Sequence, residues 1–359
     1  MKKFIQKQPL IFLILALPLA IIGEVFHWHP GWIFSFSALA IIPLAGLIGD
    51  ATEILAHYAG PRWGGFLNAT FGNAAELIIT IAAIRQGLLE LVKASLTGSI
   101  LGNLLLVLGM AMLVGGVRNK DQHFDRRSAS RNAIMLVLTV LILLIPSVLS
   151  HYIGVINPQP SPKVEILSLG VATIMIILYI LNLLFGFWTK TTETEIPAQL
   201  EEKNHKLVYS RNTAIMILLF ATIGVAAMSE ILVQTIEPIV ESLGLSEFFI
   251  GVIFIPIIGN VAEHLVAVQM AYKNRMTLSV EIAISSSLQI ALFVAPILIF
   301  ISLWLGHPLT LIFNQFELLA LIAGVLITAL VSEDGESNWF EGVELLAVYL
   351  VLGLAFFLL

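Results

Sequence analysis

The sequence predicts an all-α polytopic membrane protein of about eleven transmembrane helices, the first outside a pair of inverted-topology five-helix repeats. The composition, the spacing of apolar stretches and the distribution of basic residues lead to this fold class. Of 359 residues, 58% are hydrophobic and 12% charged, against roughly 25% charged in soluble domains. Too few polar side chains remain to cover soluble domains of this length.

The charge and the cysteine count exclude several classes of function. A net charge of −6 leaves no basic surface for nucleic acid. The chain has no cysteine, so it has no disulfide, thiolate metal site or cysteine nucleophile.

Eleven apolar stretches lie between polar, proline or glycine residues, and each is long enough to be a membrane-spanning helix. None of them contains Lys or Arg. Because Lys2, Lys3 and Lys7 precede the first stretch, it also resembles a cleaved signal peptide, but a multi-span protein needs no cleavage and a retained helix is favoured. The stretches are approximately 9–26, 33–59, 64–84, 94–117, 133–149, 166–187, 214–236, 248–270, 277–305, 309–331 and 343–359.

The basic residues are strongly biased to one side of this arrangement. With eleven alternating spans, all of the 18 Lys and Arg residues except Arg85, Lys93 and Lys163 fall on the side of the amino terminus. Positively charged loops stay in the cytoplasm, so we expect a cytoplasmic amino terminus and an external carboxyl terminus. The short loops and the lack of a long amino-terminal extension favour a prokaryotic plasma (inner) membrane.

A five-residue motif occurs once in each half of the chain. Residues 72–76, Gly-Asn-Ala-Ala-Glu, align with residues 259–263, Gly-Asn-Val-Ala-Glu, and the same offset aligns Ser99 with Ser286. The two motifs lie in spans that cross the membrane in opposite directions, so the repeat is inverted. Such repeats are typical of secondary transporters with a site near the bilayer midplane. The predicted parts are helix 1 (1–32), a first repeat (33–189), an acidic cytoplasmic linker (190–212) and a second repeat (213–359).

Several acidic residues, among them Asp50, Glu53, Glu76, Glu230 and Glu263, lie deep within predicted spans. A charge at the bilayer centre costs at least ~2.5 kcal/mol, and no span contains a basic residue. Each acid must therefore be protonated, hydrated or neutralised by a bound cation. These are the states of a proton-coupled cation transporter.

The motifs also supply oxygen ligands. We expect Gly72 and Gly259 to interrupt their helices and expose backbone carbonyls near the two motif carboxylates. Calcium takes six to eight oxygen ligands, whereas soft metals prefer thiolates. Two carboxylates neutralise one divalent ion or bind two protons, so the two cargoes compete. The candidate ligands are Glu76, Glu263, Gly72, Gly259, Asn73, Asn260, Ser99, Ser286 and Gln289.

At these residues the sequence resembles the cation/proton exchanger (CAX) branch of the calcium/cation antiporter superfamily. The resemblance covers nearly the whole chain and includes Gly-Asn-x-x-Glu in each half, Ser-x-x-Gln at Ser286 and Gln289, and the acidic linker. It implies calcium export in exchange for protons, with Glu76 and Glu263 as central ligands. The first half departs from symmetry, because Gly102 stands where the second half has Gln289.

The roles of other residues stay open at this point. Glu53 and Glu230 resemble family acids that relay protons, or they form hydrogen bonds between helices. His264 is a proton acceptor or a packing residue. Small-residue runs, Gly98-Ser99, Gly102 and Gly115-Gly116, are expected to permit close helix packing. The resemblance implies that the acidic linker attracts calcium or gates the entrance; alternatively, it is only a solvated linker. Its acids are Glu193, Glu195, Glu201 and Glu202.

Alternative functions are a sodium-coupled or broader divalent cation exchanger and a cation channel. An enzyme is disfavoured because the chain has no His-Glu-x-x-His, no Gly-x-Ser-x-Gly and no cysteine. We expect no cofactor; the partners are calcium, protons and the lipid bilayer.

Overall fold

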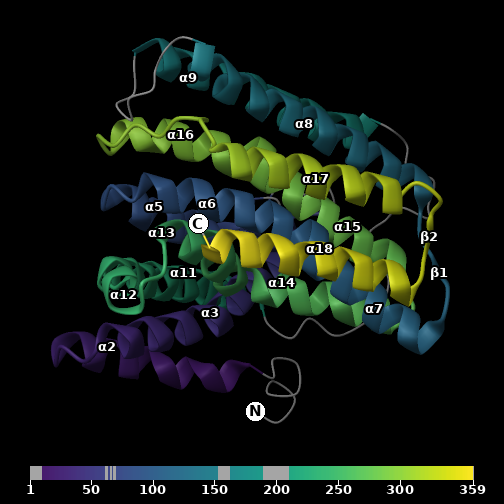
Figure 1. Cartoon of the computed structure of the whole chain (residues 1–359). Coiled ribbons are helices and arrows are strands. Elements are labelled where there is room, and N and C mark those ends of the chain that lie inside the picture. The colour runs from purple at the N-terminus through teal and green to yellow at the C-terminus, as the bar shows by residue number, and fades with distance from the viewer. Residues whose placement is uncertain are drawn as a thin grey trace.

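The computed structural model describes residues 10–60, 64, 67, 70–152, 162–188 and 210–358. The linker acids Glu193, Glu195, Glu201 and Glu202 lie outside these residues. Helices make up nearly all of the described chain, with 3₁₀ turns in η1 and π-helical turns in η2, η4 and η5 (Figure 1). In chain order they are η1 (Ile11–Leu15), α2 (Ala16–Val25), α3 (Pro30–Ala59), α5 (Ala74–Arg85), α6 (Leu89–Leu101), η2 (Gly102–Val107), α7 (Leu108–Asn119), α8 (Arg126–Tyr152), α9 (Pro162–Trp188), α11 (Arg211–Gln234), α12 (Ile236–Leu243), α13 (Glu247–Phe249), η4 (Ile250–Phe254), α14 (Ile255–Tyr272), α15 (Met276–Gln289), η5 (Ile290–Val294), α16 (Ala295–Trp304), α17 (Gln315–Val331) and α18 (Trp339–Leu358).

The predicted fold class is confirmed. Among the described residues, eight helices are long and apolar enough to cross a membrane, and two shorter apolar helices are Ile11–Val25 and Gln315–Val331. With α5, these helices account for the eleven predicted spans. Several boundaries differ from prediction. Within the predicted stretch 64–84, α5 begins only at Ala74; α6 begins at Leu89 instead of residue 94, α8 at Arg126 instead of residue 133, and α17 at Gln315 instead of residue 309. The later start of α17 has a local cause, because Asn314 and Glu317 form a capping box there.

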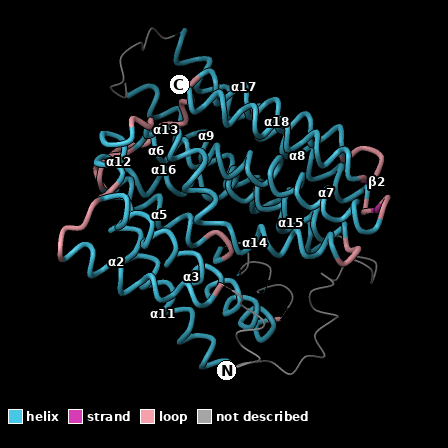
Figure 2. Tube along the Cα trace, turned by 60° about the horizontal axis from the view of Figure 1, so that its bottom comes forward, coloured by secondary structure: helices cyan, strands magenta, loops and turns pink. Residues whose placement is uncertain are grey.

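The connections gather at two opposite ends of the bundle (Figures 1 and 2). At one end the short strands β1 (Gln122–His123) and β2 (Glu336–Ser337) pair antiparallel and join the α7–α8 and α17–α18 connections. The side chain of Gln122 donates to the Ala271 carbonyl at 2.9 Å, which brings the end of α14 to the same place. At the other end Ser147 of α8 donates to the Leu311 carbonyl at 3.2 Å. This distribution is the one that eleven alternating spans require.

Two composite spans, α6–η2–α7 and α15–η5–α16, form the buried centre of the bundle. Gly98 on α6 allows a close crossing, because a Cβ there would lie 2.0 Å from the Val252 carbonyl oxygen of η4. The expectation of close packing is therefore confirmed at Gly98, and also at Gly116, which lies against the backbone of Trp339. The expectation is wrong for Gly102: it is buried, but a Cβ there would meet nothing within 4 Å.

Candidate cation site

The two Gly-Asn-x-x-Glu motifs meet where α5 and α14 cross. Glu76 lies in the first turn of α5, and its side chain is enclosed, at 1% exposed. A Cβ on Gly259 of α14 would lie 3.6 Å from the Cα of Glu76, so the two backbones are close together. Glu263 follows one turn after Gly259, and its charge is near enough to interact with that of Glu76. The tertiary structure thus brings together the two acids that the repeat singled out.

Each motif carboxylate ends a chain of hydrogen bonds that runs from an amide through a serine. In the first chain, Asn260 donates to Ser99 at 3.4 Å, and the Ser99 hydroxyl donates to Glu76 Oε1. In the second, Asn103 donates to Ser286 at 3.1 Å, and the Ser286 hydroxyl donates to Glu263 Oε2 at 3.1 Å. The two glutamates precede their serines by the same 23 residues. These chains fix the carboxylates, since every donor in them points toward an acid.

The motif asparagines reach across from one half of the chain to the other. Asn260 of α14 contacts Ser99 of α6, and Asn73 donates to Gln289 of α15 at 2.7 Å. A strict two-fold relation would place Asn73 on Ser286. Instead Asn103 takes that position, and the Gln289 side chain, which has no counterpart at Gly102, receives Asn73. The predicted departure from symmetry at Gly102 and Gln289 therefore changes the hydrogen bonding of the site.

Three buried oxygens at this crossing accept no hydrogen bond. They are Asn73 Oδ1, Glu76 Oε2 and Asn260 Oδ1. Most buried polar atoms in proteins have partners, so three unpartnered acceptors from the two motifs indicate an incomplete shell. Carboxylate and amide oxygens are the ligands that calcium prefers. In the described part of the chain no cluster of three or more Asp, Glu or His side chains is present, so a cation here depends on the two carboxylates and on neutral oxygens.

The prediction of two glycine-interrupted helices is half correct. Gly72 and Asn73 form a turn before α5, as expected. Gly259 lies inside the continuous helix α14, where each carbonyl accepts the N–H four residues on, so the expectation that Gly259 exposes its carbonyl is wrong. The irregular stretch occurs earlier, as the π-turn η4 just before Pro256, because proline lacks the N–H that a regular ladder requires. A Cβ on Gly259 would make only ordinary van der Waals contact with Glu76.

Two of the predicted proton-relay acids lie on the paired helices α3 and α11. Glu230 forms an ion pair with Arg85 at 3.2 Å, with side chains 35% and 59% exposed. The expectation that the intramembrane acids have no basic partner is therefore wrong for Glu230. Its partner Arg85 lies in the last turn of α5, just beyond the end of the predicted span, and so was not counted within it. Glu53 is half-buried on α3, which packs against α14. His264 is half-buried next to Glu263.

Sequence reasoning missed Asn103. This residue is 1% exposed in the π-turn η2 and supplies the first donor of the Glu263 chain. One signal was available, since Asn103 is an amide in an apolar span directly beside Gly102. The alignment of the two repeats did not single out Asn103, because the residue at the same offset in the second half is the apolar Ile290.

Comparisons with known proteins cover almost the entire chain. The family described as sodium/calcium exchanger protein matches residues 29–188 and 213–358. The Ca²⁺/H⁺ antiporter of Aphanothece halophytica is 44% identical, over 98% of this chain and 97% of that protein. The Ca²⁺/H⁺ antiporter ChaA of Bacillus subtilis is 45% identical, over 97% of this chain and 99% of that protein. The solved structure of native YfkE superimposes with a TM-score of 0.84 at 41% identity, covering 98% of this chain and all of that one.

Proposed function

The chain belongs to the sodium/calcium exchanger protein family, and from that premise we propose that it is a secondary transporter that exports calcium in exchange for protons. The single observation that carries the proposal is the set of three unpartnered buried oxygens that the two motifs contribute. Full-length relatives that are Ca²⁺/H⁺ antiporters support the choice of cargo and of coupling ion. They also support transport over enzymatic activity.

Exchange follows from competition for the same carboxylates. Glu76 and Glu263 neutralise one calcium ion, with Asn73 and Asn260 completing the oxygen shell. When calcium leaves, the two acids repel each other in a buried site until protons replace it. The serine chains hold one oxygen of each acid in place, so the cargo is bound by the other oxygens. Ser99 and Ser286 are therefore positioning residues in this proposal, while the proton-relay roles of Glu53 and His264 stay predictions.

The two carboxylates differ in access. Glu76 is enclosed, whereas Glu263 is half-buried. Of the two acids, Glu263 is therefore the residue nearer to the surface in this conformation.

The division into repeats, 33–189 and 213–359 with a separate helix 1 (1–32) and a linker (190–212), belongs to the same proposal. The equal 23-residue spacing of the glutamate–serine pairs supports it.

The protein is an integral membrane protein, and we place it in the plasma membrane of a prokaryote. Bacterial relatives support this location. The excess of Lys and Arg at the end of the bundle with the β1–β2 pair supports a cytoplasmic position for that end. The amino terminus is then cytoplasmic and the carboxyl terminus external.

Calcium uptake into proteoliposomes tests the proposal. An imposed pH gradient, with sodium absent, should drive uptake by the wild-type protein, and Glu76→Gln and Glu263→Gln should each reduce it to the level of empty vesicles. The matched control is Glu317→Gln: this acid is equally enclosed, at 1% exposed, but accepts hydrogen bonds from Asn314 and Thr97 at the end of α17. The control should retain uptake.

Three results would contradict the proposal. Uptake that needs a sodium gradient would favour a sodium-coupled exchanger. Flux without any counter-ion gradient would indicate a channel. Wild-type uptake by either Gln variant would remove the central assignment of Glu76 and Glu263.

A further inference from the structure

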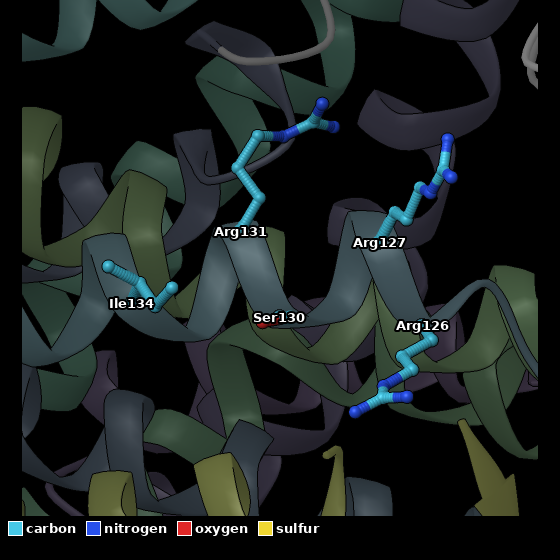
Figure 3. Close-up of a pocket in the computed structure, with 5 residues that line it drawn as sticks. All are labelled: Arg126, Arg127, Ser130, Arg131 and Ile134. Carbon is cyan, nitrogen blue, oxygen red and sulfur yellow. The ribbon is translucent and has the colours of Figure 1, made fainter. Parts of the chain in front are cut away.

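A basic cavity lies at the amino-terminal end of α8, away from the cation site. Its volume is about 550 Å³, and it is lined by Arg126, Arg127, Ser130, Arg131 and Ile134 (Figure 3). Arg127 and Arg131 leave the same side of the helix, one turn apart, and Arg126 leaves the other side. The guanidinium groups of Arg127 and Arg131, on one side of the helix, point to an anionic ligand.

These arginines form no ion pair within the described part of the chain. None of the ion pairs found among the described residues includes Arg126, Arg127 or Arg131. Asp125 is committed to the backbone, where its Oδ1 accepts from the N–H of Arg127 at 2.9 Å. Glu281 of α15 accepts from the Ser128 hydroxyl at 3.4 Å. Arg131 donates only a long hydrogen bond, at 3.5 Å, to the Ser128 hydroxyl. Within the described residues, the guanidinium groups of Arg127 and Arg131 therefore have no carboxylate partner.

Arg127 and Arg131 lie at the amino-terminal end of an exposed apolar stripe on α8. Arg127 and Arg131 continue, at helical spacing, into Ile134 (60% exposed), Leu138 (54%) and Leu141 (49%), and Ile145 and Val148 extend the stripe along α8. The 27 residues of α8 make it about 40 Å long, longer than the ~30 Å hydrocarbon core. Its first turns therefore lie at headgroup depth, and the stripe below them faces acyl chains.

We propose that this cavity binds the phosphate headgroup of one anionic phospholipid, whose acyl chains lie along the apolar stripe of α8. Guanidinium groups bind phosphate oxygens in bidentate fashion. An apolar stripe alone would accept any lipid. The arginines select the anionic lipid, and the stripe selects a lipid over a free phosphate ion.

Native mass spectrometry of the full-length protein tests the proposal, with phosphatidylglycerol titrated into detergent micelles and phosphatidylcholine as the comparison. The wild-type protein should retain one phosphatidylglycerol in preference to phosphatidylcholine. This comparison tests the proposal even if a variant fails to fold. One cation at a membrane surface changes the affinity for anionic lipid about fivefold. The double variant Arg127→Gln/Arg131→Gln should therefore bind phosphatidylglycerol about 25-fold more weakly.

Lys120→Gln/Lys273→Gln is the matched control. It removes two exposed cations from the turns after α7 and α14, at the same end of the bundle, and should keep wild-type lipid binding. Equal binding of the two lipids by the wild-type protein would overturn the proposal, as would equal losses in the two double variants. Equal thermal stabilisation by inorganic phosphate and by phosphatidylglycerol would show a simple anion site instead of a lipid site.

Discussion

Replacing Asn103 tests whether the hydrogen-bond chains position the carboxylates. Asn103→Leu keeps the side-chain volume but removes the amide that donates to Ser286 at 3.1 Å. A buried polar atom that loses its partner costs about 1–3 kcal/mol. The lower part of that range, about 1.4 kcal/mol, corresponds to a tenfold change in an equilibrium constant. We therefore expect the calcium concentration for half-maximal uptake to rise about tenfold, with maximal uptake much less affected.

The assay is pH-driven calcium uptake into proteoliposomes at graded calcium concentrations. Thr139→Val is the control, because Thr139 is equally buried but donates to the Met135 carbonyl of its own helix. A double-mutant cycle sharpens the test: Ser286→Ala already breaks the chain, so adding Asn103→Leu should weaken calcium affinity little further. A wild-type calcium dependence for Asn103→Leu, or full additivity with Ser286→Ala, would refute the positioning role.

Two further predictions concern packing and surface charge. Gly98→Ala should destabilise the protein by about 1–3 kcal/mol, because its Cβ would meet the Val252 carbonyl oxygen. Gly170→Ala, with open space around the new Cβ, should not destabilise it; equal thermal unfolding of the two variants in detergent would contradict the close crossing. Arg85→Gln should cost no more than about 1 kcal/mol, since its ion pair with Glu230 is partly exposed. That loss should shrink at high salt, and a loss independent of salt would show that Arg85 acts through packing instead.

Much of the candidate cation site was predictable from the sequence. The motif acids and asparagines, Ser99, Ser286 and Gln289 all take part in one of three hydrogen-bonded sets that involve the two motifs. The residues that escaped prediction are those whose role depends on a neighbour from elsewhere in the chain. Asn103 matters because Ser286, 183 residues away, lies beside it. Glu230 has a partner because α11 packs against α5.

The sequence by itself determined the number of spans, the two ends of the bundle and the chemistry of the site. These properties depend on local quantities: the length of each apolar stretch, the side on which its flanking charges remain, and the cost of an ionisable group in hydrocarbon. Only the tertiary structure decided how amides, serines and acids pair, and which oxygens remain without a donor. Hydrogen bonds act over about 3 Å, so their partners are set by how helices distant in the sequence cross.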